Sequence, residues 1–145
     1  MTVDSRPQHV IVGVDGSPPG GRALALGIEE ARFRHAKLSV IYAFPALVSL
    51  FGTTAHEYYP QLQKEAETAL SGILSEAPPM DDLQVTSSAI GGNPAETLIE
   101  ASRDGSMLVV GSRGRGGFAG LVLGSVANQC VQHAHCPVLV AREDN

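Results

Sequence analysis

Short apolar runs alternate along the chain with longer amphipathic segments. The first run, His9–Val14, is rich in β-branched residues and bounded by polar ones, which is typical of a strand buried on both faces of a sheet. Runs of the same kind predict further strands at Leu38–Ala43, Leu83–Ile90, Met107–Val110 and Val138–Ala141. Strands that alternate with helices indicate a parallel sheet with helices on both faces.

The segment after the first run carries a clear helix signal. Ser17 stands directly before Pro18, which is the arrangement of an N-cap residue followed by proline in the first turn. Leu24, Ile28 and Ala31 then repeat on one helical face. These residues predict a helix between the first two strands.

Three further helices are predicted. One is stopped by Pro78 and Pro79 and carries an apolar repeat made of Leu62, Ala66, Ala69, Leu70 and Ile73. The segment Asn93-Pro94-Ala95-Glu96 is close to a capping box and begins a helix that ends near Gly105. The last predicted helix covers Val126–Ala134.

A long connection, Phe44–Tyr59, separates the second strand from the second helix. It contains His56 and Tyr58, and connections of this length are either functional or mobile. A lid over a ligand and a mobile loop are therefore both open interpretations.

Right-handed crossovers between such strands predict a doubly wound, three-layer α/β/α sandwich with a five-stranded parallel sheet, a Rossmann-like fold. We expect one domain over residues 1–145, with its core at about 9–142. Ligands of such sheets bind outside the carboxyl ends of the strands, where the winding direction switches. This rule selects the loops after Val14, Ala43 and Val110.

Composition and charge narrow the classes of function. The chain is 43% hydrophobic and 17% charged, as in ordinary globular proteins, and its net charge of −5 argues against nucleic-acid binding. No apolar stretch is long enough to span a membrane, and MTVDSRPQH lacks the apolar region of a secretory signal. With only Cys130 and Cys136, a disulfide framework is not indicated, and we expect a cytoplasmic protein.

A glycine-rich loop follows the fourth strand and runs from Gly111 to Ser125. We expect Gly111 and Gly114 to adopt positive φ and to bring backbone N–H groups close to a ligand. Gly124 and Ser125 precede the last helix, where unpaired N–H groups favour an anion and the serine hydroxyl adds a donor. These features suit a phosphate.

Two arginines, Arg113 and Arg115, lie in this loop and can pair with phosphate oxygens. The alternative is a flexible surface loop whose glycines only provide turns and whose arginines are solvated. The loop is not a Walker A motif, because no Lys-Ser or Lys-Thr follows its glycines.

The spacing Gly111-x2-Gly114-x9-Gly124-Ser125 resembles the ATP-binding signature of the universal stress protein family. The resemblance extends over about His9 to Arg142. It includes the opening Val-Gly-Val-Asp-Gly-Ser, the segment Gly92-Asn-Pro-Ala and the closing Cys-Pro-Val-Leu-Val.

The resemblance implies a set of nucleotide contacts. Asp15 matches the acidic residue that meets the nucleotide near ribose and adenine, and Ala43 matches the small position whose backbone lies against adenine. The phosphate-binding positions are matched by Gly111, Gly114, Gly124 and Ser125. The family further implies ATP, or ADP or AMP, with a divalent ion such as Mg²⁺ or Mn²⁺, and a homodimer formed partly through the last strand.

Each contact also has a structural alternative. Asp15 can accept hydrogen bonds from ribose hydroxyls or the adenine amino group, but Asp-Gly-Ser is also a good turn and cap sequence. The backbones of Val14 and Ala43 can read adenine, yet both residues equally fit the core of the sheet.

The function predicted first is an ATP-binding regulatory protein of the stress response, with slow hydrolysis at most, because no residue is placed to orient water and there is no transition-state lysine. The alternatives are an ATP pyrophosphatase or adenylyl-transferring enzyme on a related sheet, and a stress protein that acts as a scaffold without nucleotide.

A possible zinc cluster of Cys130, His133, His135 and Cys136 is not predicted to bind metal. Cys130 shares a helical face with Ala127, Val131 and Ala134, which reads as a core stripe. Structural cysteines and exposed histidines account for the cluster.

Overall fold

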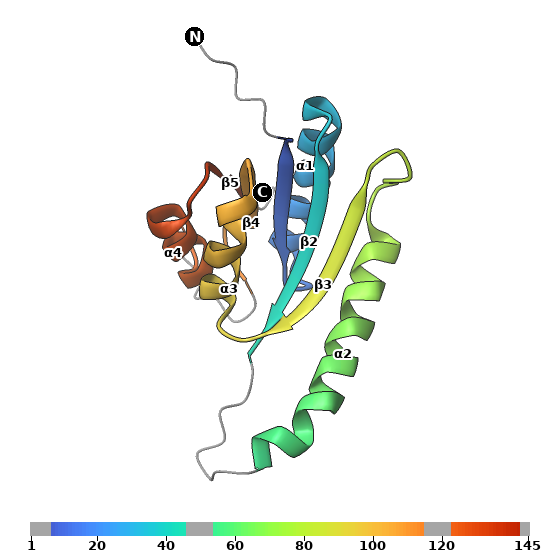
Figure 1. The fold of residues 1–145 in the computed structure, drawn as a ribbon, viewed down its shortest axis with the longest axis vertical. Coiled ribbons are helices and arrows are strands. Elements are labelled where there is room, and N and C mark those ends of the chain that lie inside the picture. Colours follow the sequence, from blue (N-terminus) through green and yellow to red (C-terminus); the bar gives the residue numbers. More distant parts are fainter. Residues whose placement is uncertain (1–6, 46–53, 115–122, 143–145) are drawn as a thin grey trace.

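A five-stranded, wholly parallel sheet forms the centre of the structure, a computed structural model that describes residues 7–45, 54–114 and 123–142 (Figure 1). Its order is β3-β2-β1-β4-β5. The strands are β1 (His9–Val14), β2 (Lys37–Phe44), β3 (Val85–Gly91), β4 (Met107–Gly111) and β5 (Val138–Ala141). The predicted strands and the doubly wound topology are confirmed, with small shifts at strand ends.

Helices cover both faces of the sheet (Figure 1). One face carries α1 (Pro18–Arg34) and α2 (Thr54–Glu76), and the other carries α3 (Pro94–Ala101) and α4 (Ser125–His133). A 3-10 turn, Ser102–Asp104, follows α3. None of the helices in the described ranges is long and apolar enough to cross a membrane.

The core is divided by the sheet into two apolar clusters. Val10 and Val12 of β1 face α1, where Leu24 and Ile28 meet them, while Ile11 faces the opposite cluster. These five side chains are almost completely buried. Because neighbouring residues of a strand point to opposite faces, only a continuous apolar run can fill both clusters.

The predicted helix caps are confirmed. The Ser17 hydroxyl accepts a hydrogen bond from the Gly20 N–H at 3.2 Å, and the Asn93 side-chain carbonyl accepts one from the Glu96 N–H at 3.0 Å. At its other end, α1 stops at His35, which has the left-handed φ of 53°. These caps fix where α1 and α3 begin at the carboxyl edge of the sheet.

The predicted connection Phe44–Tyr59 was too long. Its last part, from Thr54, belongs to α2, and Pro60 lies inside that helix; residues 46–53 lie outside the described residues. The start of α2 extends beyond the end of the sheet (Figure 1). The predicted apolar repeat therefore begins only at Leu62, after the helix has reached the end of the sheet.

The expected core stripe of α4 was wrong at one position. Ala127 and Cys130 are buried, but Val131 is 50% exposed. The short helix α4 packs against the sheet only through a narrow apolar stripe, and Val131 lies outside this stripe.

Candidate functional site

The three loops selected from the sequence lie at one edge of the sheet. Val14 is the last residue of β1, Ala43 is the next-to-last residue of β2, and Gly111 is the last residue of β4. In the order β2-β1-β4 these strands are neighbours, and the winding direction reverses between β1 and β4. This edge is where ligands bind in open parallel sheets.

Asp15 organises the turn between β1 and α1. Its Oδ1 atom accepts hydrogen bonds from the Ser17 backbone N–H, at 2.9 Å, and from the Ser17 hydroxyl. Gly16, between them, has a φ of 82°, which a residue with a side chain adopts at a cost. The turn role considered for Asp15 is therefore present in the structure.

The loop after β4 comes back onto the same carboxylate. A Cβ atom at Gly114 would lie 2.7 Å from Asp15 Oδ2, and one at Gly20 would lie 2.7 Å from Asp15 Oδ1. A Cβ atom at Gly111 would meet the Pro19 backbone at 2.8 Å. These glycines allow the loops after β1 and β4 to pack against each other.

The expectation of positive φ at Gly111 and Gly114 was wrong. Neither lies in the left-handed region. Gly111 continues a strand, and Gly114 is exposed, so their shared requirement is the space that a Cβ would occupy. Close approach, not an unusual turn, explains both.

Gly124 closes the glycine-rich loop. It is the N-cap of α4, and its N–H donates to the Ser112 carbonyl at 2.6 Å. A Cβ at Gly124 would lie 3.2 Å from the Arg113 Cα. The amide of Gly124 is thus used by a carbonyl of the protein, while the amide of Ser112 is bound to Ala141.

The first turn of α4 opens at this point. The N–H groups of Ser125, Val126 and Ala127 donate to no carbonyl of the described residues, and the helix ladder starts with Asn128 N–H to Gly124. The Ser125 hydroxyl accepts from Gln129 Nε2 at 3.0 Å and can still donate its proton.

The other predicted contacts are less distinctive. The Val14 side chain is buried among the core residues under α1, so only its backbone reaches the edge, and Ala43 is half-buried. Arg113 is half-buried beside Gly124. Arg115 and the rest of 115–122 lie outside the described residues.

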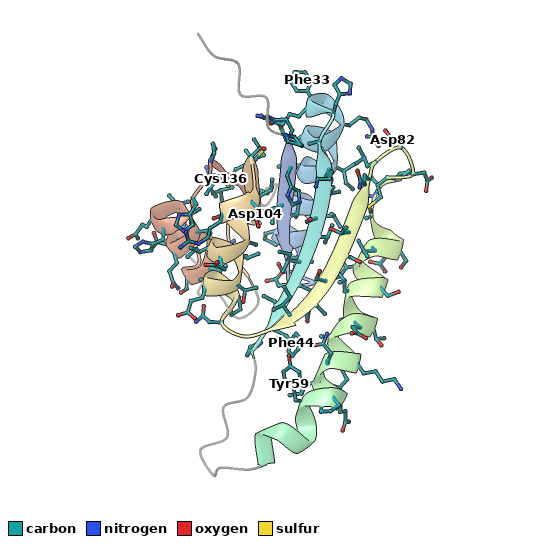
Figure 2. The ribbon with its side chains drawn as sticks, viewed as in Figure 1. Phe33, Phe44, Tyr59, Asp82, Asp104 and Cys136 are labelled. Carbon is teal, nitrogen blue, oxygen red and sulfur yellow. The ribbon has the colours of Figure 1, made fainter. Side chains whose placement is uncertain are left out.

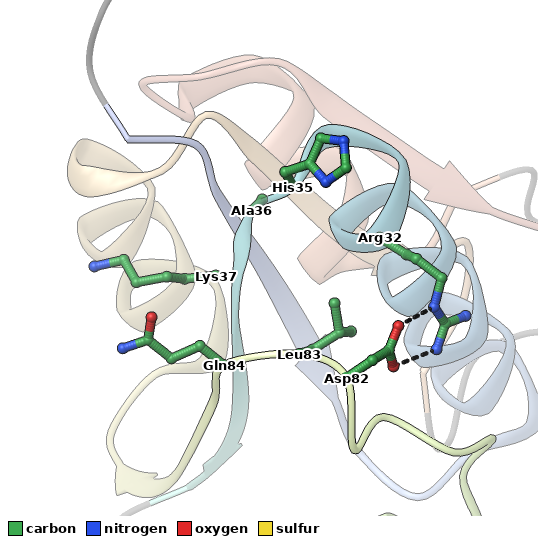
Figure 3. A pocket seen from close by; sticks show the side chains of 7 residues that line it. All are labelled: Arg32, His35, Ala36, Lys37, Asp82, Leu83 and Gln84. Carbon is green, nitrogen blue, oxygen red and sulfur yellow. Dashed lines mark hydrogen bonds and ion pairs between the residues drawn. The ribbon is translucent and has the colours of Figure 1, made fainter.

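Two surface hollows lie away from this edge. One, of about 430 Å³, is formed where α1 ends and β2 and β3 begin, and Figure 3 shows Arg32 and Asp82 paired across one side of it. The other, of about 470 Å³, lies between α2 and β3. Neither includes a predicted site residue.

The charges of the first hollow are largely paired. Arg32 Nε and Nη2 donate to the two carboxylate oxygens of Asp82, at 2.7 and 2.9 Å. This hydrogen-bonded contact lowers the pKa of the Asp82 carboxyl and raises the pKa of Arg32.

Within the described ranges, no three His, Cys, Asp or Glu side chains come together as a metal site would require. Cys130 is buried in the core and Cys136 is half-buried. Burial raises the pKa of the Cys130 thiol to about 11 and also raises the pKa of Cys136.

Sequence reasoning missed two neighbours of Asp15. Ser17 was expected only as a cap, but it also holds the Asp15 carboxylate, and Gly20 lies against that carboxylate. The available signal was the run Asp15-Gly-Ser-Pro-Pro-Gly-Gly, in which glycine recurs inside the first turn of a helix where its propensity is poor.

The chain was compared with known sequences. A family model described as "Universal stress protein family" matches residues 7–142. Universal stress protein Rv2005c of Mycobacterium tuberculosis is 38% identical over 144 residues, covering 94% of this chain and 47% of that protein. Universal stress protein Rv2623 of the same species is 37% identical over 148 residues, covering 98% and 48%. The chain spans about half the length of these relatives.

Solved structures share the fold. Universal stress protein UspA from Lactobacillus plantarum superposes with a TM-score of 0.82 at 20% identity, covering 96% of this chain and all of that one. A universal stress protein in complex with cAMP gives 0.65 at 24% identity, covering 97% and 100%. An Arabidopsis thaliana family protein with AMP bound gives 0.61 at 20%, covering 95% and 93%.

Proposed function

The chain belongs to the universal stress protein family, and on this premise we propose that it is a regulatory protein that binds ATP at the carboxyl edge of β1, β2 and β4. The observation that carries the proposal is the contact between two loops. Gly114, from the loop after β4, lies against the carboxylate of Asp15, from the loop after β1, beside the open first turn of α4.

The phosphates are assigned to the α4 side of this contact. The first-turn amides of α4 and the Ser125 hydroxyl are donors at a positive helix end, which favours an anion. The absence of a Cβ at Gly111 and Gly114 lets the phosphates come close to the backbone, and Arg113 adds positive charge. The Gly124 N–H keeps its hydrogen bond to the Ser112 carbonyl, and this bond joins the two ends of the glycine-rich loop behind the phosphates.

The ribose and the base are assigned to the β1 and β2 side. Asp15 would repel phosphates but accepts hydrogen bonds from ribose hydroxyls, and the backbones of Val14 and Ala43 line the path to the base. The solved relatives in complex with cAMP and AMP support an adenine nucleotide. ATP is our finer assignment, from the spacing of Gly111, Gly114, Gly124 and Ser125.

A divalent ion, Mg²⁺ or Mn²⁺, fits this site as a companion of the phosphates. Among the described residues no dedicated cage of acidic side chains exists, and Mg²⁺ often binds through phosphates, water and at most one or two carboxylates. The ion would neutralise phosphate charge, and the protein would position the phosphates.

Hydrolysis is proposed to be slow. Fast hydrolysis of a nucleoside triphosphate commonly uses a lysine at the terminal phosphate and a residue that orients the attacking water. Both lysines of the sequence lie elsewhere: Lys37 begins β2 at the opposite edge of the sheet, and Lys64 is exposed on α2. Binding of ATP would therefore act as a signal that partners read, in the cytoplasm and on a homodimer joined through β5.

One experiment separates this proposal from its alternatives. The purified protein is denatured, the released nucleotide is identified, and added ATP is followed for turnover. Stoichiometric ATP without turnover supports the regulator. Fast multiple turnover would favour an ATP pyrophosphatase or adenylyl-transferring enzyme, and absence of both bound nucleotide and affinity would leave a scaffold.

A further inference from the structure

An aromatic pair lies at the carboxyl ends of β2 and β3. The rings of Phe44, the last residue of β2, and Tyr59, in the first turns of α2, have centroids 6.4 Å apart and planes tilted by 38°. Figure 2 shows both side chains beyond the end of β2, between that strand and α2. Neither residue belongs to the site described above.

The pair rests on a glycine. Gly91 ends β3 opposite Phe44, and a Cβ at Gly91 would lie 3.0 Å from Tyr59 Cε2, 3.1 Å from the Tyr59 hydroxyl oxygen and 3.1 Å from Phe44 Cζ. The Gly92 N–H donates to the Phe44 carbonyl at 2.9 Å. The strand ends therefore hold the two rings at a fixed place.

The two rings differ in exposure. Phe44 is 7% exposed and completes the core, whereas Tyr59 is 43% exposed. A large ring that is held in place but left half open presents an apolar surface to whatever lies beyond the strand ends. Cε2 and the hydroxyl oxygen are the Tyr59 atoms nearest to Gly91, so this side of the ring packs on the strand end, and the fold does not use the exposed remainder.

This surface lies within reach of the proposed nucleotide. Strands are spaced by about 4.8 Å, so the ends of β1 and β3 are separated by about 10 Å across β2. A nucleoside whose ribose lies at Asp15 and whose base crosses the end of β2 at Ala43 points its base toward Phe44 and Tyr59.

We propose that Tyr59 is the base-recognition residue of this site, with its ring packed against the adenine and seated on Phe44 and Gly91. The inference rests on the proposed function and deepens it, since it names the group that distinguishes a purine nucleotide from a bare sugar phosphate. Aromatic side chains contact every base through its π face, so this contact adds affinity for the base and leaves the phosphate contacts unchanged.

The first test is calorimetric titration of AMP and of ribose 5-phosphate into the wild type, Tyr59→Leu, Tyr59→Phe and Phe33→Leu. Phe33 is the matched control, because it is an aromatic residue that is 83% exposed and lies near the C-terminal end of α1, away from the proposed site. We expect Tyr59→Leu to weaken AMP about tenfold without changing ribose 5-phosphate, and Tyr59→Phe and Phe33→Leu to leave both unchanged.

Equal AMP affinity in wild type and Tyr59→Leu would overturn the inference and leave the proposed function standing. A wild type that binds no adenine nucleotide would overturn both. Loss of both ligands in a folded Tyr59→Leu would show that the residue supports the site as a whole, which also contradicts base recognition.

A second measurement avoids dependence on one variant. The chain contains no tryptophan, so Tyr59→Trp places a single reporter at the proposed base contact. We expect AMP to change the indole fluorescence in a saturable way and ribose 5-phosphate to leave it unchanged. An indole signal that stays constant at saturating AMP would contradict the proposal.

Discussion

At the scale of single residues, the Asp15 carboxylate is enclosed by positions that have no room for a side chain. Gly20, in the first turn of α1, and Gly114, in the loop after β4, approach its two oxygens, and Ser17 donates to it from the turn. The carboxylate is therefore held in one orientation, which is the condition for a carboxylate to recognise a ribose at low entropic cost.

A methyl group at Gly114 tests this arrangement. Gly114→Ala would place a carbon 2.7 Å from Asp15 Oδ2 and must displace the carboxylate or the loop. We expect ATP affinity to fall about tenfold, while the free energy of unfolding changes little because Gly114 is exposed. Calorimetric titration and urea unfolding measure the two effects.

Gly21→Ala is the matched control for that variant. Gly21 lies in the first turns of α1, and a Cβ there meets nothing within 4 Å. Its ATP affinity should equal that of the wild type, and its helix should be slightly more stable. Unchanged affinity in Gly114→Ala would count against the proposed site.

The buried thiol of Cys130 gives a prediction about pH. Its native pKa is raised to about 11, and the ordinary value is 9.0, so the unfolded chain loses this proton first as pH rises. The stabilising contribution of the neutral thiol is therefore fully present below pH 9. Between pH 9 and 11 the free energy of unfolding falls by up to about 1.4 kcal/mol per pH unit.

The measurement is urea unfolding at several pH values in wild type and Cys130→Ala. All other titratable groups are the same in both proteins, so the difference between the two stability curves isolates the thiol. A difference that does not change with pH would show that Cys130 ionises normally in the native state.

At the scale of elements, the sequence predicts a helix or strand well where a local signal and a core face coincide. Ser17 and Asn93 have both, and the starts of α1 and α3 are confirmed. The start of α2 has neither, because the helix there extends beyond the sheet. Val131 shows the converse: its periodicity is right, but the stripe that α4 buries is narrower than the pattern.

The ion pair of Arg32 and Asp82 is an interaction between elements, since it joins the last turn of α1 to the turn before β3. Asp82→Asn should lower stability slightly at pH 7, because both side chains are about half exposed and exposed pairs contribute little. The native pKa of Asp82 lies below 3.8, so its contribution is complete above pH 3.8 and is lost as pH falls through the native pKa.

Unfolding of wild type and Asp82→Asn is compared at pH 7 and at low pH, with Asp81→Asn as the neighbouring exposed control. The two stability curves should converge at low pH and in high salt. A difference that persists in acid would mean that the asparagine acts through packing instead of charge.

At the scale of the whole molecule, the topology follows from the alternation of apolar runs and helices, and the topology alone brings the ends of β1, β2 and β4 together. The details of the candidate site do not follow in this way. The bond from Gly124 to Ser112 and the approach of Gly114 to Asp15 join residues far apart in the sequence, and no local pattern encodes which amide pairs with a carbonyl. The glycines in the sequence indicate that a close contact is needed at these positions, but they do not identify the contacting group.

The proposed dimer also belongs to this scale, because it depends on the open edge of the sheet at β5. The carbonyl of Pro137, directly before β5, accepts from the Leu108 N–H of β4, and the carbonyl of Ala141, the last residue of β5, accepts from the Ser112 N–H directly after β4. Backbone direction alternates along a strand, so Leu139 also faces β4, while the N–H groups of Val138 and Val140 face outward.

One substitution at two adjacent positions therefore has opposite consequences. Val140→Pro removes an outward N–H that a second copy would bind, and it keeps the ladder to β4, so we expect a folded monomer at micromolar concentration where the wild type is a dimer. Leu139→Pro removes a ladder bond and leaves a carbonyl of β4 without its donor, which should destabilise the fold by about 1–3 kcal/mol. Sedimentation and thermal unfolding distinguish these outcomes. A wild type that is monomeric at micromolar concentration would remove the dimer, and a dimeric Val140→Pro would move its interface away from β5.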